Sequence, residues 1–152
     1  MKAFAASMAV LLFGAAASVA AAGGSSASVV ASSYKPGAKV ALTFSMKYPM
    51  QCADPGRTLV IRLPDGMSKP ARINPMTVRV NGAIPKTVNT SGSAVSIQIG
   101  QKQWITCNLV GMGKLSVVIG TAAGLSNPKT AGVYGFPIAI GTIRGTPMLR
   151  IT

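Results

Sequence analysis

Apolar and polar residues alternate along much of the chain with a period of two. The clearest stretch is residues 39–46, where large apolar side chains share one parity and polar or small side chains occupy the other. Residues 58–63 and 76–80 repeat the alternation. Because successive side chains of a β-strand point to opposite faces, this pattern predicts strands with one buried face.

Turn signals separate these segments. Asn81-Gly82 is a strong hairpin signal, because a type I′ turn needs positive φ at both positions. We expect residues 83–88 to return as an edge strand, since Pro85 cannot donate a hydrogen bond to a neighbour. Further strands are expected at residues 94–99, 114–119, 132–140 and 149–151. With no capped helical stripe, the sequence predicts an all-β fold, an antiparallel β-sandwich of about seven to eight strands.

The N-terminal region has the organisation of an export signal. Lys2 precedes an apolar stretch over residues 3–19, and Ala20-Ala21-Ala22 supplies the small residues of a cleavage site. A retained membrane anchor is the alternative, because about 20 apolar residues can span a bilayer. We therefore predict a signal peptide over residues 1–22 and a secreted, cell-surface or periplasmic protein. The Gly/Ser/Ala-rich composition of residues 23–34 predicts a flexible leader, and we expect residues 35–152 to form a single domain.

The chain has two cysteines, Cys52 and Cys107, and both follow the predicted signal. In an oxidising compartment two such residues predict one disulfide. Two free thiols are the alternative.

The composition excludes most catalytic chemistry. The chain has no histidine, which removes Ser-His-Asp and Cys-His arrangements and imidazole metal ligands. The only acidic residues, Asp54 and Asp65, lie in Pro/Gly turns, where they favour turn formation. Met46, Met50 and Cys52 offer soft sulfur ligands for copper, but core packing and a disulfide account for them more simply. We expect no enzyme activity, no metal and no cofactor.

The net charge is strongly positive. The chain has 15 Lys and Arg against two acidic residues, a formal charge of +13. Strand parity places Lys39, Arg62 and Arg79 on solvent faces, where they would form a basic stripe if their strands are neighbours. Such a stripe predicts binding to an anionic envelope polymer or membrane surface; solubility or adaptation to habitat is the alternative. Specific nucleic-acid recognition is not expected, because few aromatic residues accompany the charge.

Several turn and strand motifs follow one another along the chain. They are Pro-Gly at residues 36–37, Leu-Pro-Asp-Gly at 63–66, Val-x-Val-Asn-Gly at 78–82, Gly-Leu-Ser-Asn-Pro at 124–128 and Gly-x-Tyr-x-Phe at 132–136. This order resembles Ig-like β-sandwich modules of bacterial secreted and surface proteins of the S-layer and adhesin type. The resemblance implies display, spacing or adhesion, and it carries over no catalytic residues.

These observations favour a non-enzymatic extracellular binding or structural module with affinity for anionic surfaces. A subunit of a fibre or coat is the alternative, in which residues 23–33 and 131–143 would pair with a neighbour's sheet edge. A secreted inhibitor or effector with a basic loop is a third hypothesis.

Overall fold

The computed structural model describes residues 26–47, 57–100 and 113–152, and these ranges form an all-β structure. Every pairing between their strands is antiparallel, which confirms the predicted all-β, antiparallel class. The predicted number of seven to eight strands is too low, because the described residues form eleven short strands. Helical structure in these ranges is limited to two short 3₁₀ turns, η1 (Pro75–Thr77) and η2 (Thr121–Ala123). Within the same ranges, no helix is long and apolar enough to cross a membrane. The predicted signal and both cysteines lie outside the described residues.

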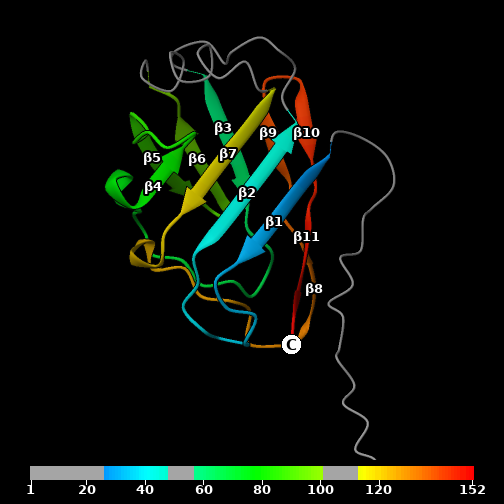
Figure 1. Cartoon of the computed structure of the whole chain (residues 1–152). Coiled ribbons are helices and arrows are strands. Elements are labelled where there is room, and N and C mark those ends of the chain that lie inside the picture. The colour runs from blue at the N-terminus through cyan, green and yellow to red at the C-terminus, as the bar shows by residue number, and fades with distance from the viewer. Residues whose placement is uncertain (1–25, 48–56, 101–112) are drawn as a thin grey trace, which may run out of the picture.

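One sheet faces the viewer in Figure 1 and is called the front sheet, with strand order β1-β2-β7-β4. Its strands are β1 (Ala27–Ala31), β2 (Leu42–Lys47), β7 (Lys114–Ile119) and β4 (Val78–Val80). Strand β7 lies between two strands that come much earlier in the chain. Ile119 is the register partner of both Leu42 and Val78. The sheet is therefore assembled from segments that are distant in sequence.

The second sheet lies behind the first and is called the back sheet, with strand order β10-β9-β3-β6-β5. Its strands are β10 (Ile143–Gly145), β9 (Ile138–Ile140), β3 (Thr58–Arg62), β6 (Ala94–Gln98) and β5 (Thr87–Ser91). A two-stranded ribbon of β8 (Gly132–Gly135) and β11 (Met148–Ile151) lies along the side of the molecule. Strand β11 runs next to β1, the edge strand of the front sheet.

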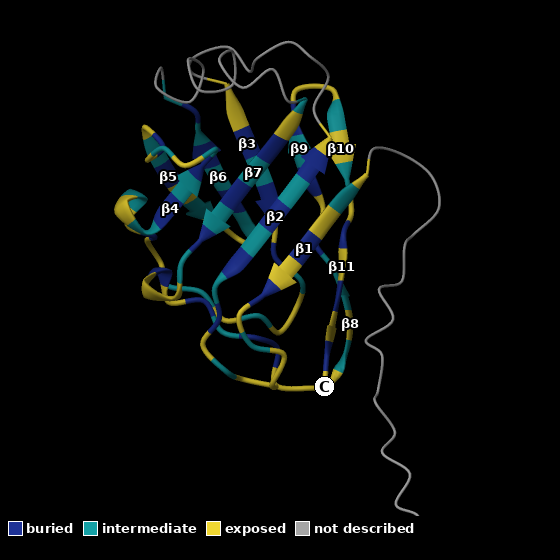
Figure 2. Cartoon of the chain, viewed as in Figure 1, coloured by how far each residue is buried: buried dark blue, intermediate teal, exposed yellow. Residues whose placement is uncertain are grey.

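The core lies between the two sheets, where their buried residues form one continuous apolar cluster. Figure 2 shows the alternation along β2 and β7 as dark buried positions between paler ones. Phe44 of β2 meets Phe136 at 5.7 Å between ring centroids, in an edge-to-face arrangement. Such a pair contributes both buried area and a favourable ring geometry. The period-two pattern in the sequence thus identifies the residues that join the sheets.

The prediction of a flexible leader over residues 23–34 is wrong for part of this segment. Residues Ala27–Ala31 form β1, which pairs with β2 along its whole length. Val29 and Ala31 are buried, whereas Ser28 and Val30 face solvent. The adjacent valines and the small residues around them obscure the alternation. The folded unit therefore begins before residue 35.

Two other segments differ from their predicted limits. The expected strand over residues 132–140 divides into β8 and β9, because the chain leaves the ribbon at Phe136 and joins β3 after Pro137. Asn81 and Gly82 do form the predicted turn, with φ of 47° and 83°. Its return is a single bridge from Val80 to Ala83, and the edge strand β5 begins only at Thr87.

These pairings limit how residues 23–33 and 131–143 could pair with the sheet edge of another molecule. Within residues 131–143, β9 already has partners on both sides, while β8 has one partner and one open edge. Strand β1, in the other segment, pairs with β2 of the same chain. Among the described strands of these two segments, β8 keeps one open edge, whereas the outer edge of β1 lies next to β11.

A buried amide fixes the loops at the lower end of the molecule. Asn127 is 1% exposed, and its Nδ2 donates to the carbonyl oxygens of Ser33 (2.8 Å) and Lys35 (3.0 Å). Its Oδ1 is buried without a hydrogen-bond partner among the described residues. The segment after β1 is thereby tied to the segment before β8, even though about ninety residues separate them.

Candidate anion-binding surface

The structure does not bring the three predicted anion-binding residues together. Arg62 lies on β3 of the back sheet and Arg79 on β4 of the front sheet. Lys39 lies before β2, where it bridges to Ser126 near the lower loops. Lys39 and Arg62 are exposed and Arg79 is half-buried, as strand parity predicted. Because Arg62 and Arg79 belong to opposite outer faces, the proposed single basic stripe is not formed.

The guanidinium of Arg79 is held by the backbone. Its Nη1 donates to the carbonyl oxygens of Met76 at 2.7 Å and Val78 at 2.9 Å. Both contacts fix the side chain over η1 and the start of β4. A donor that already has two acceptors contributes less to binding a ligand, although its charge still adds to the local field.

The front sheet brings two other lysines together. Lys47 ends β2 and Lys114 begins β7, and the two residues are direct register partners. Both are exposed, on the face opposite to the buried residues Met46 and Leu115. Directly opposed residues of an antiparallel pair have Cβ atoms roughly 5 Å apart. Both ammonium groups can therefore reach the same small anion.

Serine residues surround this lysine pair. The Lys47 N–H donates to the Ser26 carbonyl oxygen at 3.1 Å, so the row of the two lysines continues to Ser26, directly before β1. In the next outward-facing row, Ser45 is paired with Ser28 on one side and Ser116 on the other. This arrangement supplies hydroxyl groups that can donate to an anion beside the two positive charges.

A depression of about 400 Å³ lies over this part of the sheet. It is lined by residues of the two rows together with their chain neighbours: Ser26, Ala27, Ser28, Ser45, Met46, Lys47, Gly113 and Lys114. The charged residues among these are Lys47 and Lys114, and none of the described lining residues is acidic. In the part of the chain that the structure describes, Asp65 is the single side-chain carboxylate, and it lies in a turn that follows β3.

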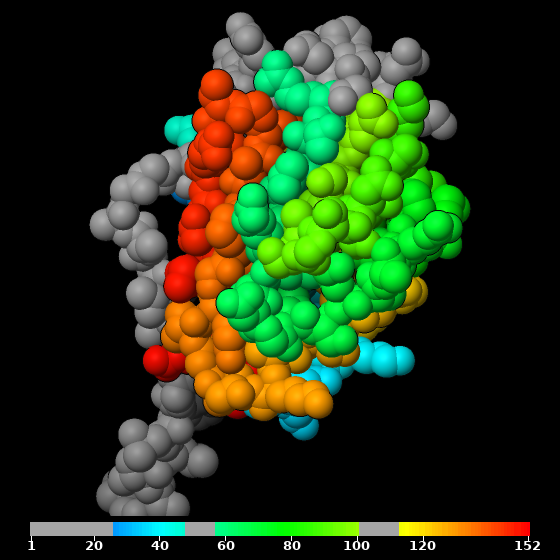
Figure 3. Space-filling view, turned by 180° about the vertical axis from the view of Figure 1, so that it is seen from behind, coloured from blue at the N-terminus to red at the C-terminus, as the bar shows by residue number. Residues whose placement is uncertain are grey.

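The outer face of the back sheet, which Figure 3 shows, arranges its cations differently. Across the sheet, Arg144 of β10 is followed by Ala139 of β9 and then by Val60 in the middle of β3, and both of these residues are uncharged. Arg62 lies two positions further along β3, in another row. Its neighbour across the pair with β6 is Ala94. The two arginines are thus held apart by small, uncharged side chains.

Only part of the signal for the lysine pair is present in the sequence. The alternation indicates that Lys47 and Lys114 each point outward at the end of a strand. The two residues are 67 positions apart, however, and the alternation does not show that their strands are neighbours. Only the pairing of β2 with β7 makes them neighbours. No group of His, Cys, Asp and Glu among the described residues has an arrangement that could hold a metal ion.

Comparison with known proteins gives a fold and no family. No protein-family model matches the chain, and no curated protein matches it. Among solved structures, the chain is similar to BslA, described as a bacterial hydrophobin, with 17% identity and a TM-score of 0.52 over 84% of this chain and 98% of that one.

The chain is also similar to the N-terminal domain of the Streptococcus gordonii adhesin Sgo0707, with 9% identity and a TM-score of 0.51. This match covers 83% of the chain and 32% of the adhesin chain. At these identities the similarity extends to the fold. It relates the all-β architecture to that of a hydrophobin and an adhesin domain from bacteria.

Proposed function

We propose that the protein is a non-enzymatic module of the bacterial cell surface that binds anionic envelope polymers. The observation that carries this proposal is the distribution of charge on the described surface. Exposed Lys and Arg lie on the outer faces of both sheets and in the lower loops, against one carboxylate side chain. A field of one sign attracts polyanions from a distance and raises their association rate.

The fold supports an extracellular role. Its neighbours are a hydrophobin and an adhesin domain, and the sequence begins with the features of an export signal. The Ig-like arrangement of the sandwich and a Cys52–Cys107 disulfide belong to this proposal. Mass spectrometry of the purified protein, treated with an alkylating reagent without reductant, tests the disulfide. Labelling of both thiols would refute it.

Salt dependence tests the proposed binding. Exposed charges are screened over about 10 Å at 0.1 M salt and about 3 Å at 1 M. We therefore expect the protein to bind immobilised heparin at low salt and to be released as salt rises, with no retention on neutral dextran. Absence of heparin binding at low salt would refute the proposed function.

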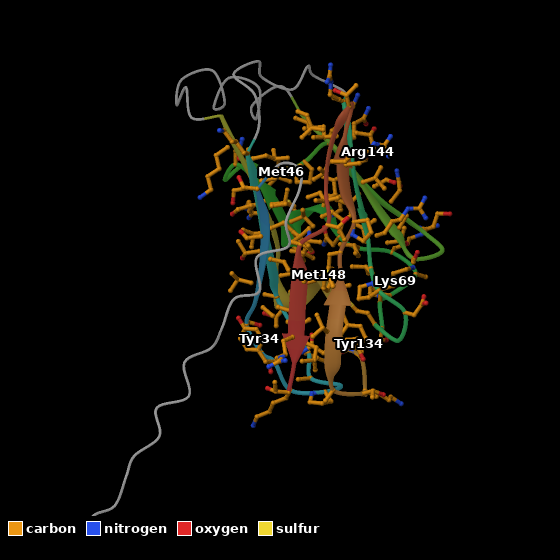
Figure 4. The ribbon with its side chains drawn as sticks, turned by 90° about the vertical axis from the view of Figure 1, so that its right-hand side faces the viewer. Tyr34, Met46, Lys69, Tyr134, Arg144 and Met148 are labelled. Atoms are coloured by element: carbon orange, nitrogen blue, oxygen red, sulfur yellow. The ribbon has the colours of Figure 1, made fainter. Side chains whose placement is uncertain are left out.

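A second candidate function is assembly into a surface layer. It is favoured by apolar side chains exposed along the β8–β11 ribbon and the edge strand β1, with exposed fractions of 51% for Val133, 40% for Met148 and 55% for Val30. Figure 4 shows Met148 on β11, with Tyr34 and Tyr134 toward the lower end of the same side. Apolar groups on one side favour contact between molecules.

Light scattering after size-exclusion chromatography separates the two functions. Assembly through the ribbon predicts an oligomer that persists at high salt and is lost in a Val133→Lys, Met148→Lys double variant. The matched control is Ser91→Lys, which places an added charge on an exposed position of β5 at the far edge of the back sheet. A salt-resistant oligomer that is insensitive to the ribbon substitutions would refute assembly through this side.

A further inference from the structure

We propose that Lys47 and Lys114, with the serines around them, form a discrete binding site for a phosphate group on the outer face of the front sheet. This inference rests on the proposed function and names the chemical group that the protein would recognise within an anionic polymer. The same group occurs in phosphate-containing polymers and in lipid headgroups, and the experiment below distinguishes these sources.

The first argument is the direct opposition of two positive charges. Like charges placed directly opposite each other on neighbouring strands destabilise a sheet. Lys47 and Lys114 hold such positions, and neither ammonium has a hydrogen bond or an ion pair with any described side chain. A bound anion between the two groups changes this repulsion into two attractions. The pairing is therefore unfavourable in the free protein and favourable in a complex.

The second argument is the number of donors. Each ammonium has three N–H groups, and charge-assisted contacts to phosphate oxygens are among the stronger hydrogen bonds in proteins. Ser26, Ser28 and Ser45 line the same depression, and their side chains make no hydrogen bonds to other described residues. A tetrahedral phosphate has several oxygens that can accept from two ammonium groups and from hydroxyls together. A single carboxylate offers fewer acceptors to the same set.

The third argument is the space and its surroundings. A volume of about 400 Å³ falls within the range of roughly 300–1,000 Å³ found for small-molecule sites. It has room for a phosphate together with part of the chain that bears it. The serine side chains that line the depression are short, so a linear polymer can approach it without steric conflict with them. Among the described residues that line the depression, none is acidic and would repel it.

Titration of the whole protein with glycerol phosphate, followed by calorimetry at low salt, tests the site. Lys114→Gln and Lys47→Gln remove one charge from the pair, and each should weaken binding by about tenfold, as expected for loss of a hydrogen bond to a charged group. The matched control is Lys39→Gln, which removes one exposed lysine charge in the lower loops. It should change the affinity by less than about twofold. Glycerol itself should not bind.

The outcomes separate this site from the wider proposal. If all three variants weaken glycerol phosphate binding equally, or if none changes it, the discrete site is refuted. Heparin binding at low salt would in that case leave the proposed function intact. If the wild-type protein binds neither glycerol phosphate nor heparin, both the site and the function are refuted. A loss confined to Lys47→Gln and Lys114→Gln supports the site.

Two further arms identify the source of the phosphate. The first uses a soluble polymer of glycerol phosphate, and the second uses phosphatidylglycerol vesicles with phosphatidylcholine vesicles as the neutral control. Binding of the polymer that is reduced by Lys114→Gln and spared by Lys39→Gln supports recognition of an envelope polymer. The same pattern with the charged vesicles alone supports a lipid headgroup. Failure of Lys114→Gln to reduce binding in either arm overturns the site.

Discussion

The inner and outer faces of the same strands obey different rules. Along β2, the inward positions Leu42, Phe44 and Met46 are large and almost fully buried. The outward positions on the same strand are Thr43, Ser45 and Lys47, which are short or charged. The inner positions must fill a shared core, so size and shape determine them. The outer positions are free of this constraint, and their chemistry is available for contacts with other molecules.

The two outer faces differ from each other as well. The front sheet places two lysines in one cross-strand pair, whereas the back sheet separates Arg62 from Arg144 by uncharged residues. The total charge is therefore a weaker guide to a binding site than the spacing between charges. A site needs two charged groups that can reach one ligand atom or group.

The largest expected effect comes from the inner face. Phe44→Ala removes a fully buried ring that packs against Phe136, and it should cost about 3–5 kcal/mol of unfolding free energy. The matched control is Thr43→Ala, on the outer face of the same strand, which should change stability by less than about 0.5 kcal/mol. Urea unfolding of both variants measures the difference. Equal costs would contradict the assignment of the two faces.

The buried amide should have an intermediate effect. Asn127→Ala removes two hydrogen bonds and leaves the carbonyl oxygens of Ser33 and Lys35 without this donor. We expect a loss of about 1–3 kcal/mol of stability, measured by thermal unfolding. Ser126→Ala is the control, because the hydrogen bonds of Ser126 are made by its backbone. A neutral Asn127→Ala would show that the loops do not depend on this contact.

The smallest stability effect is expected at the lysine pair, and its sign is opposite. Lys47→Glu replaces a repulsive cross-strand pair by an attractive one and should raise stability by about 0.2–1 kcal/mol. The same substitution should abolish the rise in melting temperature that phosphate gives to the wild-type protein. Arg62→Glu, on the back sheet, should leave the phosphate effect in place. A destabilised Lys47→Glu variant would contradict the proposed repulsion.

The sequence predicts local structure well where large apolar residues alternate strictly with polar ones. The alternation over residues 39–46 and 114–119 identifies β2 and β7, and Asn81-Gly82 identifies a turn. These features depend on neighbours in sequence. Strand β1 was missed because its small residues, with two adjacent valines, resemble a flexible segment.

Long-range pairing could not be predicted in this way. Nothing in either segment indicates that β7 lies between β2 and β4, and this placement decides which lysines meet. The predicted residues Lys39, Arg62 and Arg79 had the right exposure but different locations. Parity gives the face of a strand, whereas a binding site also requires the identity of the neighbouring strand.

The position of β7 also affects how fast the front sheet can fold. Until this strand arrives, β2 can pair only with β1, and its second edge stays open while β4 has no partner in the front sheet. Closing such a sheet brings together segments many residues apart, which in β-rich domains takes milliseconds to seconds. A newly made chain therefore spends an appreciable time without its front sheet. That delay exposes the edge of β2 to chaperones or to other copies of the chain.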